Sequence, residues 1–457
     1  MYHLISHASA VRIEHDAPAA LFALAAARLT YLIAQRLVLG PERHAVHVTR
    51  RRIKRTWPRT ARRLGLVLEE ISTPWFSTQP SRKVLTPALR TRREQWGVRA
   101  EVRTIEGVGL DELQKAADHL ANAWRVPIVR VDQQQPGTVI IRALLWDPLT
   151  TETTTTDQAA HHAVGSWLIG TDQDGAAATV RTRDVSGIAV AGLAGYGKTN
   201  LLDVRFAQLA PSEVVQFAVI DGKGGPDWDE HAPRCFAFAK DDLDQAHTIL
   251  SHLHNLLTLR QHLIRDQLGV KNLWEHGPTK AWPLVVLIID EAHTFFYETK
   301  GSDSKSKQRD QLSREIVRMV EELVRKGRNV GIQTILATQK ATGDAIPTKI
   351  RDNCQVAISF AQRTSEAATA ILGSDITQHP DAHPRNLQNP AYVGVATLVA
   401  DGQPGYTLVR TPRAGSSEDI QRLARQHAHL VVDPLLLLGG TEPGQDNVII
   451  LDERKAA

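Results

Sequence analysis

Residues 192–199 carry the pattern of a loop that binds the phosphates of a nucleotide. They match G-x-x-x-x-G-K-[ST]. In such a loop the backbone N–H groups point at phosphate oxygens, the lysine reaches the β- and γ-phosphates, and the final hydroxyl binds Mg²⁺. The sequence therefore predicts a site for ATP and Mg²⁺. The predicted nucleotide-binding residues are Gly192, Leu193, Ala194, Gly195, Tyr196, Gly197, Lys198 and Thr199, with Thr199 also a metal ligand.

An acidic pair closes an apolar run further along the chain. Residues 284–289 are six apolar residues, and Asp290 and Glu291 follow them. Carboxylates at the carboxyl end of a buried parallel strand lie at the sheet edge where ligands bind. We expect Asp290 to bind Mg²⁺ and Glu291 to orient or deprotonate the attacking water. Because binding alone would not require Glu291, the pair favours hydrolysis.

The segments around these residues predict an α/β fold with a mostly parallel central sheet. Residues 188–191 are apolar and strand-like, and residues 200–209, which lack Gly and Pro, read as a helix. Residues 217–221 predict another core strand and residues 242–267 a long helix. The polar residues 299–311 predict a flexible insertion.

Length and composition divide the chain into five parts. At 457 residues it is long enough for about three domains. We predict an amphipathic helix and basic arm over residues 1–66, a small α/β domain over 67–148 and a Thr-rich linker over 149–162. The motor domain is predicted over 163–430 and a tail over 431–457.

The small domain has a compact strand–helix–strand–strand pattern. Alternating residues 98–103 predict a strand, and one apolar face over 110–124 predicts a helix. Two further strands are predicted at 128–131 and 139–141, with a turn over 133–137.

Positive charge gathers near the N-terminus. The whole chain has a formal net charge of +4, yet residues 41–103 hold 16 Lys or Arg against five Asp or Glu, a surplus of 11. Such a patch indicates a polyanionic partner, either nucleic acid or anionic lipid, although a solvated basic face has the same composition. We favour DNA. The predicted contact residues of this arm are Arg50, Arg51, Arg52, Lys54 and Arg55.

The sequence predicts a protein of the cytoplasm. Two cysteines exclude a disulfide scaffold and indicate a reducing compartment, and no secretory signal opens the chain. Residues 17–34 are apolar but interrupted by Arg28, which favours an amphipathic helix packed on protein over a membrane span. The alternative is a helix on the membrane surface, which would place the protein peripherally at the inner face of the cell membrane.

The order of the motifs resembles that of DNA translocases of the FtsK/SpoIIIE type. After the phosphate loop and the acidic pair come Gly-Arg-x-x-Gly-Ile at 327–332, Leu-Ala-Thr-Gln at 336–339 and Ile-Arg-Asp-Asn at 350–353. The first two of these elements are more specific than general nucleotide motifs. The resemblance covers about residues 163–410 and is strongest to actinobacterial plasmid or integrative-element transfer proteins.

This resemblance implies a RecA-like P-loop motor that hydrolyses ATP to move double-stranded DNA. Motors of this family are hexameric rings of identical subunits with the nucleotide between them, so one subunit completes the site of its neighbour. Arg328 matches the position of an arginine finger acting in trans, and Arg325 and Lys326 are the competing candidates.

Further roles follow from the same resemblance. Gln339 matches a residue that senses the γ-phosphate, and Lys340 and Arg351 match residues that contact the DNA backbone in the pore. The Ser-Arg pair usual in the last conserved helix is missing, and Arg363 is the nearest candidate to replace it.

The predicted function is an ATP-driven translocase that moves plasmid or integrative-element DNA during conjugation. Two interpretations from other classes stay open. Relatives with the same motor domain move polypeptides in protein secretion, although they carry several motors in tandem. A nucleotide-gated DNA-binding protein would need little hydrolysis.

Overall fold

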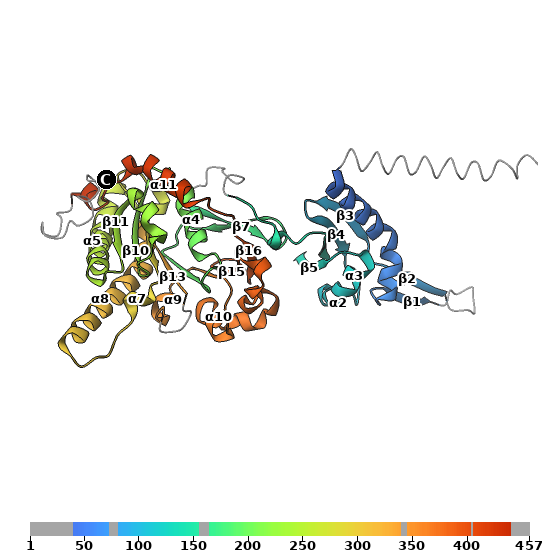
Figure 1. Cartoon of the computed structure of the whole chain (residues 1–457). Helices are drawn as coiled ribbons and strands as arrows, with labels where there is room; N and C mark the ends of the chain where they lie inside the picture. The colour runs from blue at the N-terminus through green and yellow to red at the C-terminus, as the bar shows by residue number, and fades with distance from the viewer. Residues whose placement is uncertain (1–39, 73–80, 155–163, 340–344, 404, 440–457) are drawn as a thin grey trace, which may run out of the picture. The chain divides into compact units, whose positions relative to one another are not determined.

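The computed structural model describes residues 40–72, 81–154, 164–339, 345–403 and 405–439. The chain divides into two compact units, one ending at Asp147 and the other beginning at Pro148 (Figure 1). No helix among the described residues is long and apolar enough to cross a membrane. The helix predicted over residues 17–34 lies outside the described residues.

The first unit contains a four-stranded antiparallel sheet of order β3-β4-β6-β5. Its helices among the described residues are the helix over residues 40–63, α2 and α3, and a separate hairpin pairs β1 with β2. The bounds are β1 Leu68–Ser72, β2 Ser81–Leu85, β3 Leu89–Glu94, β4 Gly97–Arg103, α2 Leu110–Lys115, α3 Ala117–Trp124, β5 Ile128–Gln135 and β6 Thr138–Leu144.

The basic helix over residues 40–63, which we predicted as part of a separate arm, is a layer of this unit. Its buried residues Ile53 and Trp57 share one hydrophobic core with Val98 of β4 and Trp124 of α3. The rings of Trp57 and Trp124 have centroids 6.2 Å apart. Apolar residues recur every three or four positions between the arginines, so one face of the helix packs while the other stays charged.

The predicted pattern of the small domain differs from the structure in several places. The hairpin strands β1 and β2 were not predicted, and β5 runs to Gln135, into the turn predicted over 133–137. The helix predicted over 110–124 is divided into α2 and α3 at Ala116. Strand β3 was not predicted, because Leu89–Glu94 contains five polar residues and shows no apolar alternation. Its pairing with β4 along its whole length holds it in the sheet.

The second unit is built on a ten-stranded sheet of order β11-β10-β12-β13-β9-β14-β15-β16-β7-β8. Strands from β11 to β14 run parallel, and β15, β16, β7 and β8 continue the sheet antiparallel. The bounds are β7 Ser166–Asp172, β8 Ala177–Arg181, β9 Gly187–Ala191, β10 Val215–Asp221, β11 Cys235–Lys240, β12 Leu284–Asp290, β13 Ile332–Thr338, β14 Val356–Ser359, β15 Val395–Ala400 and β16 Thr407–Arg410.

Helices cover both faces of this sheet. Side chains of β10 alternate between the two cores: Ile220 packs with α5, α8 and α10, whereas Val219 packs with α4 and α11. Strands buried on both faces explain the continuous apolar runs in the sequence. The bounds are α4 Lys198–Leu209, α5 Leu243–Leu268, α6 Leu273–His276, α7 His293–Phe296, α8 Ser304–Lys326, α9 Thr348–Arg351, α10 Ser365–Leu372 and α11 Ser417–Gln426.

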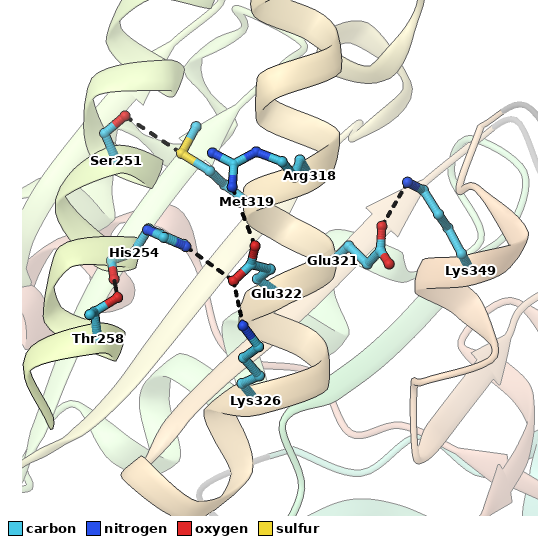
Figure 2. Close-up of polar contacts among 9 residues, drawn as sticks. All are labelled: Ser251, His254, Thr258, Arg318, Met319, Glu321, Glu322, Lys326 and Lys349. Carbon is cyan, nitrogen blue, oxygen red and sulfur yellow. Dashed lines mark hydrogen bonds and ion pairs between the residues drawn. The ribbon is translucent and has the colours of Figure 1, made fainter. Parts of the chain in front are cut away.

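Helices α5 and α8 are joined by two histidine–glutamate pairs. His247 contacts Glu315 at 2.9 Å, and His254, seven residues later, contacts Glu322 at 3.2 Å. Figure 2 shows the second pair, where Lys326 also approaches Glu322.

The prediction of a flexible insertion over residues 299–311 is wrong from Ser304 onward, where the chain is helical. Helix α8 begins at Ser304, because the carboxylate of Asp303 caps it by accepting from the N–H of Ser306.

The motor unit includes parts of the segments that were predicted as linker and as tail. Part of the predicted linker, residues 149–154, packs on the motor: Leu149 is buried, and the N–H of Arg413 donates to the carbonyl of Thr153 at 2.8 Å. The predicted tail begins inside the motor core, where Leu435 is buried and Asp433 contacts His252. Residues 155–163 and 440–457 lie outside the described residues.

Candidate functional site

The predicted phosphate loop connects β9 to α4, as its motif requires. Gly192, Gly195 and Gly197 all have positive φ angles, of 155°, 80° and 110°. A Cβ on Gly192 would lie 2.5 Å from the Cβ of Phe360, so both conformation and space require glycine there. Helix α4 begins at Lys198, directly after the loop. The loop therefore presents the N-terminus of α4, with its free N–H groups, to a bound anion.

Lys198 lies inside the loop. Its side chain is 6% exposed, and its Nζ donates to the carbonyl of Gly192 at 2.9 Å. Burial lowers the pKa of Lys198, and the charges of Asp290 and Glu291 act in the opposite direction. The lysine therefore lies within the electrostatic reach of the predicted acidic pair.

Asp290 is the last residue of β12, and its carboxylate is held from two sides. Oδ2 accepts a hydrogen bond from Nε1 of the buried Trp228 at 2.9 Å. Oδ1 accepts from the N–H of Glu291 at 3.0 Å. These two donors fix the orientation of a carboxylate that is only 5% exposed.

Glu291 turns the chain out of β12 in a left-handed conformation, with φ of 49°. Such a φ is uncommon for a residue with a side chain and marks local strain. The carboxylate reaches the end of β13, where it accepts from the N–H of Gln339 at 3.1 Å and from Oγ1 of Thr338 at 3.2 Å. The fold thus brings together Glu291 and Gln339, which the sequence predicted separately.

Asp221 is a residue of this edge that we did not assign to the site. It ends β10 and stands opposite Asp290 in the strand register. Burial raises the pKa of Asp221, and the negative charge of Asp290 adds to the effect. Its Oδ1 accepts from the N–H of Lys223, whereas its Oδ2 has no hydrogen-bond partner among the described residues. The signal in the sequence was an aspartate closing an apolar strand, as at Asp290.

Behind Asp290 lies a supporting group that no motif indicated. Trp228 packs against His231 with ring centroids 4.6 Å apart, and Nε2 of His231 contacts Oδ1 of Asp203 on α4 at 2.9 Å. Burial raises the pKa of Asp203, while the contact with His231 opposes the rise. The helix that begins at the phosphate loop is thereby connected to the residue that orients Asp290.

The oxygen groups of this edge fit the requirements of Mg²⁺. Magnesium prefers oxygen ligands and is usually held by one or two carboxylates together with substrate phosphates. Asp290 and Asp221 supply such carboxylates, and Thr199, in the first turn of α4, supplies a hydroxyl. The unpartnered, buried Oδ2 of Asp221 is the observation that favours a cation.

A cavity of about 260 Å³ adjoins the loop. Gly195 and Gly197 line it together with Asn200, Gly394, Thr411 and Arg413. Glu152, from the segment that follows the first unit, also lines this cavity and pairs with Nε of Arg413 at 3.1 Å. The first residues of the second unit are therefore part of the wall beside the phosphate loop.

Arg328 is not part of this cluster. It lies in the short 3₁₀ helix Gly327–Val330 between α8 and β13, and it is exposed. It precedes the seven-residue strand β13, at whose far end Gln339 lies. A strand of this length spans on the order of 20 Å, so Arg328 lies at the opposite edge of the sheet from its own phosphate loop.

The predicted pore residues fall in different places. Lys340 lies outside the described residues. Arg351 ends α9, where its guanidinium donates to Asp352 and to the carbonyl of Ala370. Lys349 of the same helix pairs with Glu321 of α8 at 2.6 Å, which braces α9 (Figure 2). Arg363 is exposed beyond the carboxyl end of β14, so β14 separates it from Arg351.

Two of the five predicted basic-arm residues donate hydrogen bonds to other elements of the first unit. Nε of Arg50 donates to the carbonyl and to Oγ1 of Thr91, both at 3.1 Å. Arg52 donates to the carbonyl of Trp124 at 2.8 Å. The other predicted residues are exposed, and further exposed arginines continue the charged face. This face comprises Arg51, Lys54, Arg55, Arg59, Arg62 and Arg63.

Comparison with known proteins identifies the first unit. Residues 43–145 match the model of the actinomycete conjugal transfer protein N-terminal domain. The predicted resemblance to actinobacterial transfer proteins is therefore confirmed. No curated protein sequence matches the chain significantly.

Two solved structures are similar to the chain at low sequence identity. The pCW3 conjugation coupling protein TcpA, in its monomer form with ATPγS, is 18% identical; the match covers 74% of this chain and 93% of TcpA, with a TM-score of 0.51. The cytoplasmic domain of the type VII secretion ATPase EccC from Thermomonospora curvata is 18% identical over 63% of this chain and 32% of that structure, with a TM-score of 0.45. The likeness to TcpA confirms the predicted RecA-like P-loop architecture.

Proposed function

We propose that this chain is an ATPase that moves double-stranded DNA during conjugative transfer. The observation that carries the proposal is the position of Glu291. Its carboxylate lies beside Asp290 and is held at the end of β13, the strand between the phosphate-loop strand and β12. A residue placed there reaches the region beyond the γ-phosphate, which a protein that only binds nucleotide would not need. The match of residues 43–145 to a conjugal transfer domain supports conjugative transfer as the biological process.

The residues of the edge divide the chemistry among them. The loop N–H groups and Lys198 bind the phosphates, while Thr199 and Asp290, with Asp221 beside them, would hold Mg²⁺. The metal, when bound, neutralises charge that develops on the phosphate oxygens. Glu291 orients the attacking water and accepts its proton. Its hydrogen bonds to Gln339 and Thr338 restrict the carboxylate to one position, which favours catalysis by pre-organisation.

A ring of subunits would complete this site. Arg328 is exposed at the opposite sheet edge, so it does not reach the phosphates of its own subunit. A head-to-tail interface brings one edge of a subunit against the other edge of its neighbour and closes into a ring. In that arrangement Arg328 would stabilise transition-state charge in trans, and we propose a hexamer by resemblance.

We propose that exposed cationic side chains contact the phosphate backbone of DNA and not its bases. Arg51, Arg55, Arg59 and Arg63 follow one another at intervals of four, which places them on one stripe of the helix over residues 40–63. The stripe is about 18 Å long at 1.5 Å per residue. Guanidinium groups in such a row bind phosphates irrespective of sequence. In the motor, Arg351, Arg363 and Lys340 stay candidates for the pore.

The test is ATP-dependent displacement of a triplex-forming oligonucleotide from duplex DNA. The wild-type chain should displace it with ATP and fail with a non-hydrolysable analogue, and Glu291→Gln should fail with both. Stimulation of the ATPase by duplex DNA should accompany displacement. An ATPase that is indifferent to DNA would instead favour a secretion motor. DNA-stimulated hydrolysis without displacement would favour a nucleotide-gated binding protein.

A further inference from the structure

The sheet of the first unit carries charge on the face turned away from its helices. Val98, Ala100 and Val102 of β4 point into the hydrophobic core, as do Val139 and Ile141 of β6. Because side chains alternate along a strand, the residues between them occupy the other face. That face contains Arg90, Arg92 and Glu94 of β3, Arg99, Glu101 and Arg103 of β4, Arg130 and Asp132 of β5, and Arg142 of β6.

Four of these arginines form one row across all four strands. Arg92 stands opposite Arg99, Arg99 opposite Arg142, and Arg142 opposite Arg130 in the antiparallel register. Like charges directly opposite each other destabilise a sheet. The fold nevertheless places four side by side, and we call them the arginine row.

Arginines outnumber acidic residues on this face of the sheet. Glu94 and Asp132 approach Arg142 from both sides, at 3.9 and 3.6 Å. Including Glu101, the face carries three carboxylates against six arginines. Arg90, Arg92 and Arg103 are exposed, and Arg99 and Arg130 are partly exposed. A net positive sheet face of this kind attracts a polyanion.

We propose that the arginine row is a second binding surface for the phosphate backbone of double-stranded DNA. Strands lie about 4.8 Å apart, so the row is about 14 Å long. This length reaches across a major groove, which is about 12 Å wide. The surface lies on the opposite layer of the unit from the helix over residues 40–63, so it is distinct from the stripe on that helix.

Duplex rather than single-stranded DNA fits this face. Proteins that bind single strands without sequence preference stack bases on aromatic side chains. The outward positions of the four strands among the described residues hold no Phe, Tyr or Trp. Arginines that bind phosphates bidentately need no such platform. The choice of partner rests on the proposed function, whereas the row itself rests on the strand register.

The test compares two triple variants of the full chain. In the row variant, Arg92, Arg99 and Arg130 become Ala, and Arg142 is kept because its carboxylate partners stabilise the sheet. The control variant replaces three exposed cations of the same unit that lie outside the row, Arg82, Lys83 and Lys115, by Ala. Binding of a labelled duplex of random sequence is measured by fluorescence anisotropy over a series of salt concentrations, without nucleotide.

Loss of three phosphate contacts in the row variant should make the negative slope of log K against log salt less steep by about 2.7. The affinity for the duplex should fall at least about tenfold. The control variant should keep the slope of the wild type. Changing the same three arginines to Lys keeps the charge and should restore most of the slope, which distinguishes contact from folding. An unchanged slope in the row variant would overturn the proposal.

Two further measurements separate this proposal from the proposed function and from a membrane surface. Oligonucleotide displacement by the wild type tests the motor, so a row effect without displacement would uphold the row and reject translocation. Co-sedimentation with phosphatidylserine-containing vesicles tests the lipid alternative. If the row variant lost vesicle binding but bound duplex like the wild type, the row would be a membrane surface and the proposal would be wrong.

Discussion

The carboxylate of Glu291 accepts a hydrogen bond from the backbone N–H of Gln339 at 3.1 Å, across the carboxyl ends of two adjacent strands. The residue proposed to position water is thus attached to the residue proposed to sense the γ-phosphate. A shift of Gln339 on nucleotide binding or release would displace Glu291. The arrangement offers a direct mechanical connection between the state of the nucleotide and the readiness of the catalytic base.

Lys198→Ala and Glu291→Gln should separate binding from turnover. Lys198→Ala removes the cation of the phosphate loop and should abolish nucleotide binding. Glu291→Gln keeps an acceptor for the N–H of Gln339 but cannot accept a proton, so it should bind ATP and hydrolyse it at least about 100-fold more slowly. Fluorescent-nucleotide binding and phosphate release measure the two effects. Near-normal turnover in Glu291→Gln would mean that another residue is the base.

Arg328→Ala should inactivate its neighbour's site rather than its own. When Arg328→Ala subunits are mixed with Glu291→Gln subunits, some interfaces pair an intact site with an intact arginine, so ATPase activity should partly return. Arg325→Ala tests the competing candidate in the same way, since Arg325 is exposed three residues earlier at the end of α8. If subunits exchange and no mixing ratio restores activity, Arg328 acts structurally within its own subunit.

Asp221→Asn should weaken magnesium binding and stabilise the metal-free protein. Burial and the charge of Asp290 raise the pKa of Asp221, so the folded state disfavours its ionised form. This cost is absent at acidic pH and grows as pH rises above the pKa of the unfolded residue, so the neutral amide should raise the Tm at pH 7 without Mg²⁺. The Mg²⁺ concentration for half-maximal ATPase should rise about tenfold or more. Asp227→Asn, which removes the nearby carboxylate that pairs with Lys223, is the control. An unchanged Mg²⁺ dependence in Asp221→Asn would remove Asp221 from the site.

Glu322→Gln should destabilise the motor at neutral pH and much less in acid. Hydrogen bonds from Lys326 and His254 hold the pKa of Glu322 down at about 2, below the ordinary value of 4.5 (Figure 2). A depressed pKa contributes stability above the pKa of the unfolded residue, and this contribution is lost as pH falls from 4.5 towards 2. Since the pair is partly exposed, we expect about 1 kcal/mol at pH 7.

Urea unfolding of the Glu322→Gln variant at pH 7 and at pH 3 measures this difference. Glu321→Gln, which removes a carboxylate from the same turn of α8 together with its pair to Lys349, is the comparison for the loss of one ion pair. A destabilisation of equal size at both pH values would show that packing rather than ionisation is responsible.

The sequence was sufficient for those parts of the site whose residues are neighbours in the chain. The predicted phosphate loop and the hydroxyl proposed to bind Mg²⁺ lie within eight residues, and the Asp290–Glu291 pair closes one apolar strand. Such short patterns imply their local geometry because strand, loop and helix follow directly from glycine freedom and hydrophobic runs. The long helix α5 was predicted for the same reason.

Tertiary structure decided the relations that depend on strand order and register. The pairing of β12 with β13 brings Glu291 to Gln339, and the pairing of β10 with β12 brings Asp221 beside Asp290. Packing of the helix over residues 40–63 turned Arg50 and Arg52 inward, and the antiparallel register aligned the arginine row. Single-strand patterns show which face a residue occupies, but not which strand lies beside it. Partners far apart in sequence are selected by the burial of whole faces, which is a property of the assembled sheet.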